Sequence, residues 1–387
     1  MIRMTRLPEE VARVLTPLKP YFSSRHYLVF CWLLVAHLGC FGKATVQGLA
    51  RYTPTHIAAW HLRRLLAAGR WQWEAVRHWL VSEALAAFPP PKDGGLYLVV
   101  DSTLKGKRSK QNPLAKKGRL NEYAPFTFGL HVVILIAQWE VYRIPLAFRL
   151  VKAKECPGYQ SENALLREML GAVILPAWGK QGVVIVDAAY LSRPNLQAIQ
   201  ARGWYFVIAF PRTWKLANGQ FLRDIVTHLP RHHYRQIRVP LVVPSARRRV
   251  FWTFAQPAQL AHGGDVTVGL RRRGRNASPK HTKLLVTNLP HATASLTVAL
   301  YLRRWPVELC IKELKSAVGL GQHQVTKDAA RVERSVAVAV MAYLLLLRLR
   351  AKPIKPGSSW SAFTRKQELA WEWGTMQLYR TVRQETR

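Results

Sequence analysis

The spacing of apolar residues divides the chain into a helical N-terminal part and a mixed α/β part. From Pro8 to about Phe88, apolar residues recur at intervals of three and four, as they do in amphipathic helices. The cluster Pro-Pro-Pro-Lys-Asp-Gly-Gly at 89–95 then interrupts this pattern. We therefore predict an all-helical domain over residues 1–90 and a different architecture after it.

A pair of helices joined by a short turn is predicted inside the helical domain. The pattern over residues 44–66 places Thr53 or Thr55 at the N-cap of the second helix. This arrangement resembles a helix-turn-helix, whose second helix would present Arg63 and Arg64 to DNA. A plain helical hairpin fits the same pattern equally well.

Strands and helices alternate in the part that follows. The apolar run Leu96–Val100 precedes Asp101, and the apolar run at 182–186 precedes Asp187 in the same way. This alternation is typical of an α/β fold, so we predict a mixed sheet with flanking helices over residues 95–320. An apolar helix within the last residues predicts a helical C-terminal region over 321–387. Further strands are predicted at 128–137, 141–151, 205–210 and 283–288, and helices at 161–170, 193–201 and 336–349.

The charge of the chain points to a polyanionic partner. There are 58 Lys plus Arg against 21 Asp plus Glu, a formal net charge of +37. Such an excess repels itself unless a polyanion neutralises it, so we expect nucleic acid as the partner. The cations are spread along the whole chain, and the apolar run at 27–41 is too short to span a bilayer. We therefore interpret that run as a core helix and expect no membrane role.

Two basic segments are candidates for phosphate contact. A loop after Asp101 contains Lys105 and Lys107, and residues 212–282 predict a β-rich basic insertion. The β-like pieces of the insertion lie between arginine runs, and we expect Arg248 and Arg272 in these runs to bind phosphates. Ordinary solvated loops are the other interpretation of these runs.

Several other motifs indicate no chemistry of their own. The four cysteines lie far apart without a Cys-x-x-Cys pair, which predicts buried thiols in a reducing cytosol rather than a zinc site or a disulfide framework. The segment Lys105-Gly-Lys-Arg-Ser lacks the first glycine of a phosphate loop. His232-His233 has no further ligand at metal-binding spacing.

Three carboxylates are candidates for a metal site. If the strands before Asp101 and Asp187 are parallel and adjacent, both side chains leave the sheet at one edge, where Glu308 from a packed helix can join them. Hard oxygen donors without His or Cys suit Mg²⁺ or Mn²⁺. Two such ions, roughly 3.5–4 Å apart, can carry out phosphoryl transfer without a covalent protein intermediate. A single strand-terminal aspartate is more often a turn residue, but two of them ahead of an acidic helix favour a site.

The segment around Glu308 carries further polar residues at helical spacing. Tyr301, Arg304, Glu308 and Lys315 stand at offsets of zero, three, seven and fourteen. At about 100° per residue these offsets predict one narrow stripe of a helix that can grip a phosphodiester. Glu313 is the rival acid, but it lies about 140° around the helix from Glu308.

Pro306 leaves two interpretations of this segment open. A proline cannot donate a helical hydrogen bond and is best tolerated in a first turn. Either the helix is kinked there, or Glu308 lies near the start of a helix. In the second case the helix dipole favours a negative side chain at Glu308, and the single stripe with Tyr301 and Arg304 is weakened.

Taken together, these motifs resemble a known family. The pattern Tyr-x2-Arg-x3-Glu-x6-Lys, preceded by Val-Val-Asp101-Ser-Thr and Val-Ile-Val-Asp187-Ala-Ala-Tyr, is similar to the DDE insertion-sequence transposases of the Tyr-Arg-Glu-Lys signature group, which are IS-four-like. The resemblance covers roughly residues 96 to 320. It implies an RNase H-like catalytic domain with a β-rich insertion, and cut-and-paste transposition by a homodimer on two double-stranded transposon ends.

The resemblance also implies roles for individual residues. Asp101, Asp187 and Glu308 correspond to the catalytic metal ligands for two Mg²⁺ ions, with Mn²⁺ as a substitute. The contacts to DNA phosphates correspond to Tyr301, Arg304 and Lys315. Similar enzymes flip a base onto a tryptophan of the insertion, for which Trp252 is the first candidate and Trp214 the second. A buried core tryptophan is the other interpretation.

Two further functions fit parts of the same pattern. A catalytically silent DNA-binding protein derived from a transposase would keep the charge and the helix-turn-helix. An RNase H-like nuclease without strand transfer would keep the carboxylates. For a transposase of this kind we expect a place in the bacterial cytosol, associated with the nucleoid.

Overall fold

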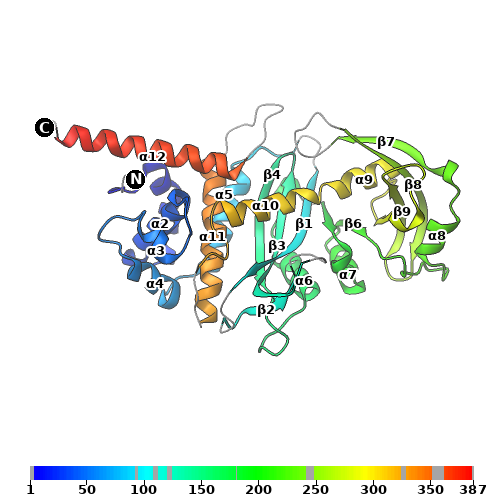
Figure 1. Cartoon of the computed structure of the whole chain (residues 1–387), viewed down its shortest axis with the longest axis horizontal. Helices are drawn as coiled ribbons and strands as arrows, with labels where there is room; N and C mark the ends of the chain where they lie inside the picture. Colours follow the sequence, from blue (N-terminus) through cyan, green and yellow to red (C-terminus); the bar gives the residue numbers. More distant parts are fainter. Residues whose placement is uncertain are drawn as a thin grey trace.

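A single mixed sheet runs through the middle of the molecule, and a layer of helices covers one end of it (Figure 1). The computed structural model describes residues 4–91, 95–107, 112–119, 124–179, 181–240, 248–323, 328–350 and 361–385, with the backbone alone at 240, 248 and 379–385.

Six strands build the first half of the sheet. They are β1 (Leu96–Gly106), β2 (Ala115–Gly118), β3 (Thr127–Trp139), β4 (Tyr142–Leu150), β5 (Gly182–Val186) and β6 (Tyr205–Ala209). β5 pairs in parallel with both β1 and β6, whereas β3 runs antiparallel to β1, β2 and β4. The apolar residues of β1 and β5 are fully buried, as expected for parallel strands covered on both faces. The predicted α/β fold of RNase H-like type is confirmed.

β1 is longer than the sequence predicts. It continues past Asp101 to Gly106, because its antiparallel partner β3 continues alongside it as far as Gly129. Its parallel partner β5 stops at Val186. Asp101 therefore lies within a strand, at the point where pairing on one side ends.

The predicted basic insertion extends the same sheet. Its elements are α8 (Leu222–His228), β7 (Arg235–Pro240), β8 (Arg248–Leu260) and β9 (Gly264–Arg272), and β10 (Lys283–Thr287) follows. β10 pairs antiparallel with β6 on one side and with β9 on the other, and β8 and β7 continue outward from β9. The insertion is thus joined to the α/β part by backbone hydrogen bonds.

The helical layer combines the two ends of the chain. α11 lies between the N-terminal helices and the sheet, where it contacts α2, α5 and β4, and α12 extends outward from it (Figure 1). The segments predicted separately as 1–90 and 321–387 therefore pack against each other. Most of α2 is buried, as predicted for a core helix. No described helix is long and apolar enough to cross a bilayer. The helices of this layer are α1 (Glu9–Leu15), η1 (Thr16–Tyr21), α2 (Ser24–Gly39), α3 (Val46–Ala50), α4 (Ala59–Ala68), α5 (Trp73–Ala86), α11 (Ala329–Leu349) and α12 (Ala362–Glu385).

The second helix of the predicted helix-turn-helix begins later than expected. Neither Thr53 nor Thr55 caps α4, which starts after Ala58. Thr53 is buried, and its hydroxyl donates to two carbonyls across the turn at 3.0 and 2.6 Å, so it holds the turn together instead. Arg63 and Arg64 are exposed on α4. Their contact with DNA stays a prediction.

The remaining helices lie along the sheet. α10 crosses β1 and β4, and α9 continues its course toward β6 and the insertion (Figure 1). α6 contacts β3, and α7 contacts β6. Their bounds are α6 (Glu162–Ala172), η2 (Ala177–Gly179), η3 (Ala188–Tyr190), α7 (Arg193–Ala201), η4 (Arg231–His233), η5 (Pro279–His281), α9 (Ala294–Leu302) and α10 (Trp305–Ser316).

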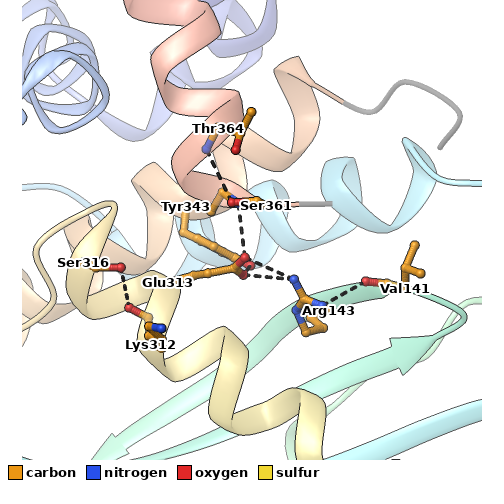
Figure 2. A network of polar contacts seen from close by, with 9 residues as sticks. Val141, Arg143, Lys312, Glu313, Ser316, Tyr343, Ser361 and Thr364 are labelled. Carbon is orange, nitrogen blue, oxygen red and sulfur yellow. Dashed lines mark hydrogen bonds and ion pairs between the residues drawn. The ribbon is translucent and has the colours of Figure 1, made fainter. Parts of the chain in front are cut away.

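A buried ionic cluster around Glu313 joins the helical layer to the sheet. The Glu313 carboxylate on α10 accepts from the Arg143 guanidinium on β4 at 3.1 and 3.2 Å, and from the Tyr343 hydroxyl on α11 at 2.8 Å (Figure 2). It also accepts from the backbone N–H of Ala362, the first residue of α12, at 3.1 Å. The side chains of Arg143 and Glu313 are only 9% and 14% exposed. Glu313 therefore fixes α10 to three other elements.

Replacing Glu313 by Ala should lower the free energy of unfolding by about 3–5 kcal/mol, because it removes the buried carboxylate that accepts from Arg143 and Tyr343. Urea unfolding followed by circular dichroism measures this change. The matched control is Lys312→Ala on the exposed side of the same helix, expected to stay within about 0.5 kcal/mol of wild type. Equal midpoints for the two variants would contradict a structural role for Glu313.

Candidate active site

Asp101 and Asp187 meet at the edge where parallel pairing ends. The register of β1 and β5 aligns Val99 with Ile185, and the same register continued by two residues aligns the two aspartates. Each carboxylate accepts a hydrogen bond from the backbone N–H of the next residue, at 2.8 Å in both cases. Neighbouring parallel strands thus bring together two acids that are far apart in the sequence.

The segment that carries Glu308 is two helices, so the prediction of a single stripe is wrong. α9 contains Tyr301 and ends at Leu302, and α10 begins at Trp305 with Arg304 as its N-cap. Pro306 lies in the first turn of α10, where its missing N–H has no helical partner to lose. Of the two interpretations of Pro306, the one that places Glu308 near the start of a helix therefore applies. Glu308 lies in the first turn, with its negative charge against the positive end of the helix dipole.

Although the segment is two helices, Tyr301, Arg304 and Glu308 still lie next to the aspartates. Arg304 donates to Asp101 at 3.0 Å and to Glu308 at 2.7 Å, so one guanidinium bridges two of the three acids. The Tyr301 hydroxyl donates to Asp187 at 3.4 Å. Side chains from β1, the end of β5 and both helices therefore meet at one edge of the sheet.

Burial and mutual repulsion shape the charges of this centre. Burial raises the pKa of Asp101, and the negative charges of Glu308 and Asp187 raise it further, against the opposing effect of Arg304. Burial acts to lower the pKa of Arg304, but the surrounding acids, Asp101 above all, outweigh it and raise that pKa. Burial and the charge of Asp187 also raise the pKa of Tyr301, so its hydroxyl keeps its proton and can donate.

The donor chemistry of the three acids fits Mg²⁺, although Arg304 now stands between two of them. Carboxylate oxygens are the ligands that Mg²⁺ and Mn²⁺ prefer. Among the described residues, however, no three His, Cys, Asp or Glu side chains form a group that could hold a metal ion. The guanidinium supplies the positive charge between Asp101 and Glu308. An ion bound by all three acids would have to displace or share these contacts.

The lysines predicted to contact DNA are partly engaged inside the fold. The Lys107 ammonium donates to two carbonyls of the loop after α10, at 2.7 Å each, and burial lowers its pKa to about 8. Lys107 therefore ties that loop to the end of β1, and its contact with DNA stays a prediction. Lys315 donates to the Thr103 hydroxyl, two positions after Asp101. Lys105 is half-buried beside the same loop.

Arg272 is a core residue, which corrects its prediction as a phosphate ligand. It is only 3% exposed, its Nε donates to the Thr282 hydroxyl at 2.7 Å, and its guanidinium lies 4.0 Å from the centre of the Tyr234 ring. All of these contacts are internal to the insertion. The other predicted arginine of the insertion, Arg248, has a side chain that lies outside the described part.

The two candidate tryptophans are both half-buried. Trp252 lies on β8 opposite Arg272, and the Arg275 guanidinium is 5.4 Å from its ring centre. Trp214 packs edge-to-face against Phe210 at 5.3 Å. Stacking of a flipped base on either ring stays a prediction.

Two cations lie at the catalytic edge that the sequence analysis did not place there, although Arg271 begins one of the arginine runs expected to bind phosphates. Lys283 begins β10, and its ammonium lies 4.6 Å from the centre of the Tyr301 ring. Arg271, near the end of β9, is its cross-strand partner. No local signal distinguishes Lys283 from the many other cations of the chain, and none shows that Arg271 lies beside it. Only the pairing of β9 with β10 and the packing of α9 place them here.

Comparison with known proteins assigns the chain to a family. Residues 95–345 match the family described as "Transposase DDE domain", and this stretch contains Asp101, Asp187 and Glu308. The match spans more than half of the chain, which therefore belongs to this family of transposases. Its class of function is that of a DNA transposase. None of the curated proteins matches the chain.

A solved structure shares a similar overall course. It is the piggyBac transposase in a synaptic complex with hairpin DNA, determined by cryo-electron microscopy. The likeness has a TM-score of 0.48 at 9% sequence identity and covers 97% of this chain and 78% of that chain. A TM-score this low supports no statement about a common function, so the assignment rests on the family match.

Replacing Arg304 by Met should make the stability of the protein depend on divalent ions. Without the guanidinium, Asp101 and Glu308 lose their countercharge, and we expect the protein in EDTA to lose roughly 1–3 kcal/mol of stability. Adding Mg²⁺ or Mn²⁺ should then raise the thermal unfolding midpoint more in the variant than in wild type. The matched control is Arg303→Met, because the Arg303 guanidinium lies over the Tyr97 ring instead. Equal ion-induced shifts in Arg304→Met and Arg303→Met would contradict the ion-binding role of these acids.

Proposed function

We propose that this chain is a Mg²⁺-dependent transposase of the cut-and-paste type. It would hydrolyse a DNA strand at each end of a mobile element and use the freed 3′-hydroxyl to attack target DNA. The observation that carries the proposal is the bridge from Arg304 to Asp101 and Glu308. It brings the acid of a distant helix to the aspartate of β1, next to Asp187, in a chain that belongs to the DDE transposase family.

In this proposal Asp101, Asp187 and Glu308 hold two divalent ions. When bound, such ions lower the pKa of the attacking water or 3′-hydroxyl and stabilise the leaving oxygen. The three acids then serve as ligands and not as general bases. Burial of Asp101 strengthens its interaction with a cation, because the surrounding dielectric is lower than that of water.

The remaining residues of the signature bind the DNA backbone. In the DNA-free structure Arg304 neutralises two acids, and the same guanidinium can donate two parallel hydrogen bonds to a phosphate. The protonated Tyr301 hydroxyl can donate to a phosphate oxygen next to Asp187. Lys315 contacts Thr103, further along β1, and can reach a neighbouring phosphate from there.

The proposed partners are double-stranded DNA and a second copy of the chain. A net charge of +37 suits an enzyme that holds two element ends and a target duplex together. A homodimer supplies one catalytic centre for each end. The bacterial nucleoid is the proposed place of action, because the substrate lies there.

Replacing Asp101 or Asp187 by Asn, or Glu308 by Gln, should abolish strand cleavage while DNA affinity stays within a few-fold of wild type. The substrate is a duplex that carries the DNA flanking the gene on each side, incubated with Mg²⁺ or Mn²⁺. Glu155→Gln is the matched control, because this acid is exposed and outside the centre. An active Asp187→Asn protein would refute the assignment.

Two control reactions separate the competing functions. If wild type binds the duplex but cuts nothing in Mn²⁺, the chain is a catalytically silent DNA-binding protein. If it cuts but does not join a supplied 3′-hydroxyl end to target DNA, it is a nuclease without strand transfer. Either result would overturn the proposal in a distinct way.

A further inference from the structure

Two like charges face each other across the strands at the catalytic edge. Lys283 and Arg271 are direct partners in the antiparallel pairing of β10 with β9. Like charges in directly opposite positions destabilise a sheet, because their side chains lie close together. The pair therefore costs stability in the protein alone, and an anion placed between the two would remove this cost.

Among the residues that the structure describes, no acid compensates this pair by direct contact. Within the described ranges, neither side chain lies within 4.0 Å of a carboxylate, and both are half-buried. Burial lowers the pKa of Lys283 and of Arg271, which is the sign of cations that have lost water without gaining a close countercharge. Each cation lies over an aromatic ring: Lys283 over Tyr301 at 4.6 Å and Arg271 over Phe251 at 4.8 Å. A cation over a ring gains only about 0.5–2 kcal/mol.

Lys283 and Arg271 lie on the Asp187 side of the centre, away from the ion pairs that Arg304 forms with Asp101 and Glu308. Arg304 donates to Asp101 and Glu308, whereas Asp187 accepts from Tyr301, the residue whose ring lies under Lys283. The charge of Asp187 acts on Lys283 from beyond ion-pair distance. Cations therefore flank the three acids on both sides. Of Arg304, Lys283 and Arg271, Arg304 alone has a described carboxylate within 4.0 Å.

From this geometry we infer that Lys283 and Arg271 form a phosphate-binding site for the DNA strand that enters beside Asp187. A phosphodiester there would meet the ammonium, the guanidinium and the Tyr301 hydroxyl together. Its negative charge would replace the repulsion between the two cations by attraction to both. This site rests on the proposed function and names the residues that hold the DNA at the Asp187 side of the same centre.

The variants Lys283→Met and Arg271→Met test this inference by three measurements. Without DNA, the thermal unfolding midpoint should stay the same or rise, because one of two opposed like charges is removed. The dependence of log affinity on log salt, measured on the end-bearing duplex, should become shallower by about 1 for each cation removed. Single-turnover cleavage at saturating DNA should fall by at least about tenfold, and Lys283→Arg should keep most of the rate.

Lys280→Met is the matched control, because it removes the same charge three positions earlier from an exposed residue of η5. We expect its cleavage rate at saturating DNA to equal that of wild type. An equal loss of rate in Lys280→Met would show an effect of total charge and would overturn the inference. So would wild-type salt dependence and rate in Lys283→Met, or a lower unfolding midpoint, which would make Lys283 a structural residue.

Failure of the proposed function can be recognised separately. If wild type binds DNA but does not cut it, the transposase proposal fails, while the salt dependence of Lys283→Met still tests the phosphate site. If wild type cuts and Lys283→Met behaves like it in every measurement, the phosphate site alone is refuted.

Discussion

The ion pairs of Arg304 are the interactions on which the candidate centre depends. Three acids at one edge of a sheet repel one another. Burial, and to a smaller extent the charges of Glu308 and Asp187, raises the pKa of Asp101. A guanidinium between Asp101 and Glu308 allows the protein to fold with these acids close together before any other cation arrives. Arg304 can do this because α9 ends just before it and α10 begins just after it. The helix break therefore has an electrostatic function as well as a geometric one.

The two acids of α10 show how burial separates structural from functional charges. Glu313 is surrounded by the Arg143 guanidinium, the Tyr343 hydroxyl and a backbone N–H, so its hydrogen-bonding capacity is used inside the protein. Glu308 lies on another side of the helix, is 36% exposed and has Arg304 as its ion-pair partner. Glu313 holds α10 against the helical layer. Because α10 is fixed in this way, Glu308 on the same helix lies next to the sheet.

The sheet also explains why the insertion belongs to the centre. Because β10 pairs with both β6 and β9, the strands of the insertion continue the sheet of the aspartates. Lys283 and Arg271 reach the catalytic edge through this pairing. The same continuity buries Arg272, since successive residues of a strand point to opposite faces. Of two adjacent arginines, one thus faces the centre and the other packs against Tyr234.

Much of the fold and part of the centre were predictable from the chain itself. Apolar runs ending in Asp101 and Asp187 indicated buried strands, because hydrophobic periodicity and turn residues are local properties. The family resemblance came from the order and spacing of the same residues. Pro306 indicated either a kink or a helix start, because proline restricts its own backbone wherever it stands, and the structure shows the helix start. The helix boundaries around α4 and the length of β1 were not predictable, since they depend on partners elsewhere in the chain.

What the sequence alone could not decide is which charges meet. It contained no signal that distinguished Lys283 from dozens of other cations, and none that separated buried Arg272 from Arg271 in the same arginine run. It also could not show that the Lys107 ammonium donates hydrogen bonds to two backbone carbonyls. Local pattern determines which elements form, because it acts through backbone preference and hydrophobic period. Burial and pairing of charges arise only when distant elements pack together, and that packing is decided by the tertiary structure.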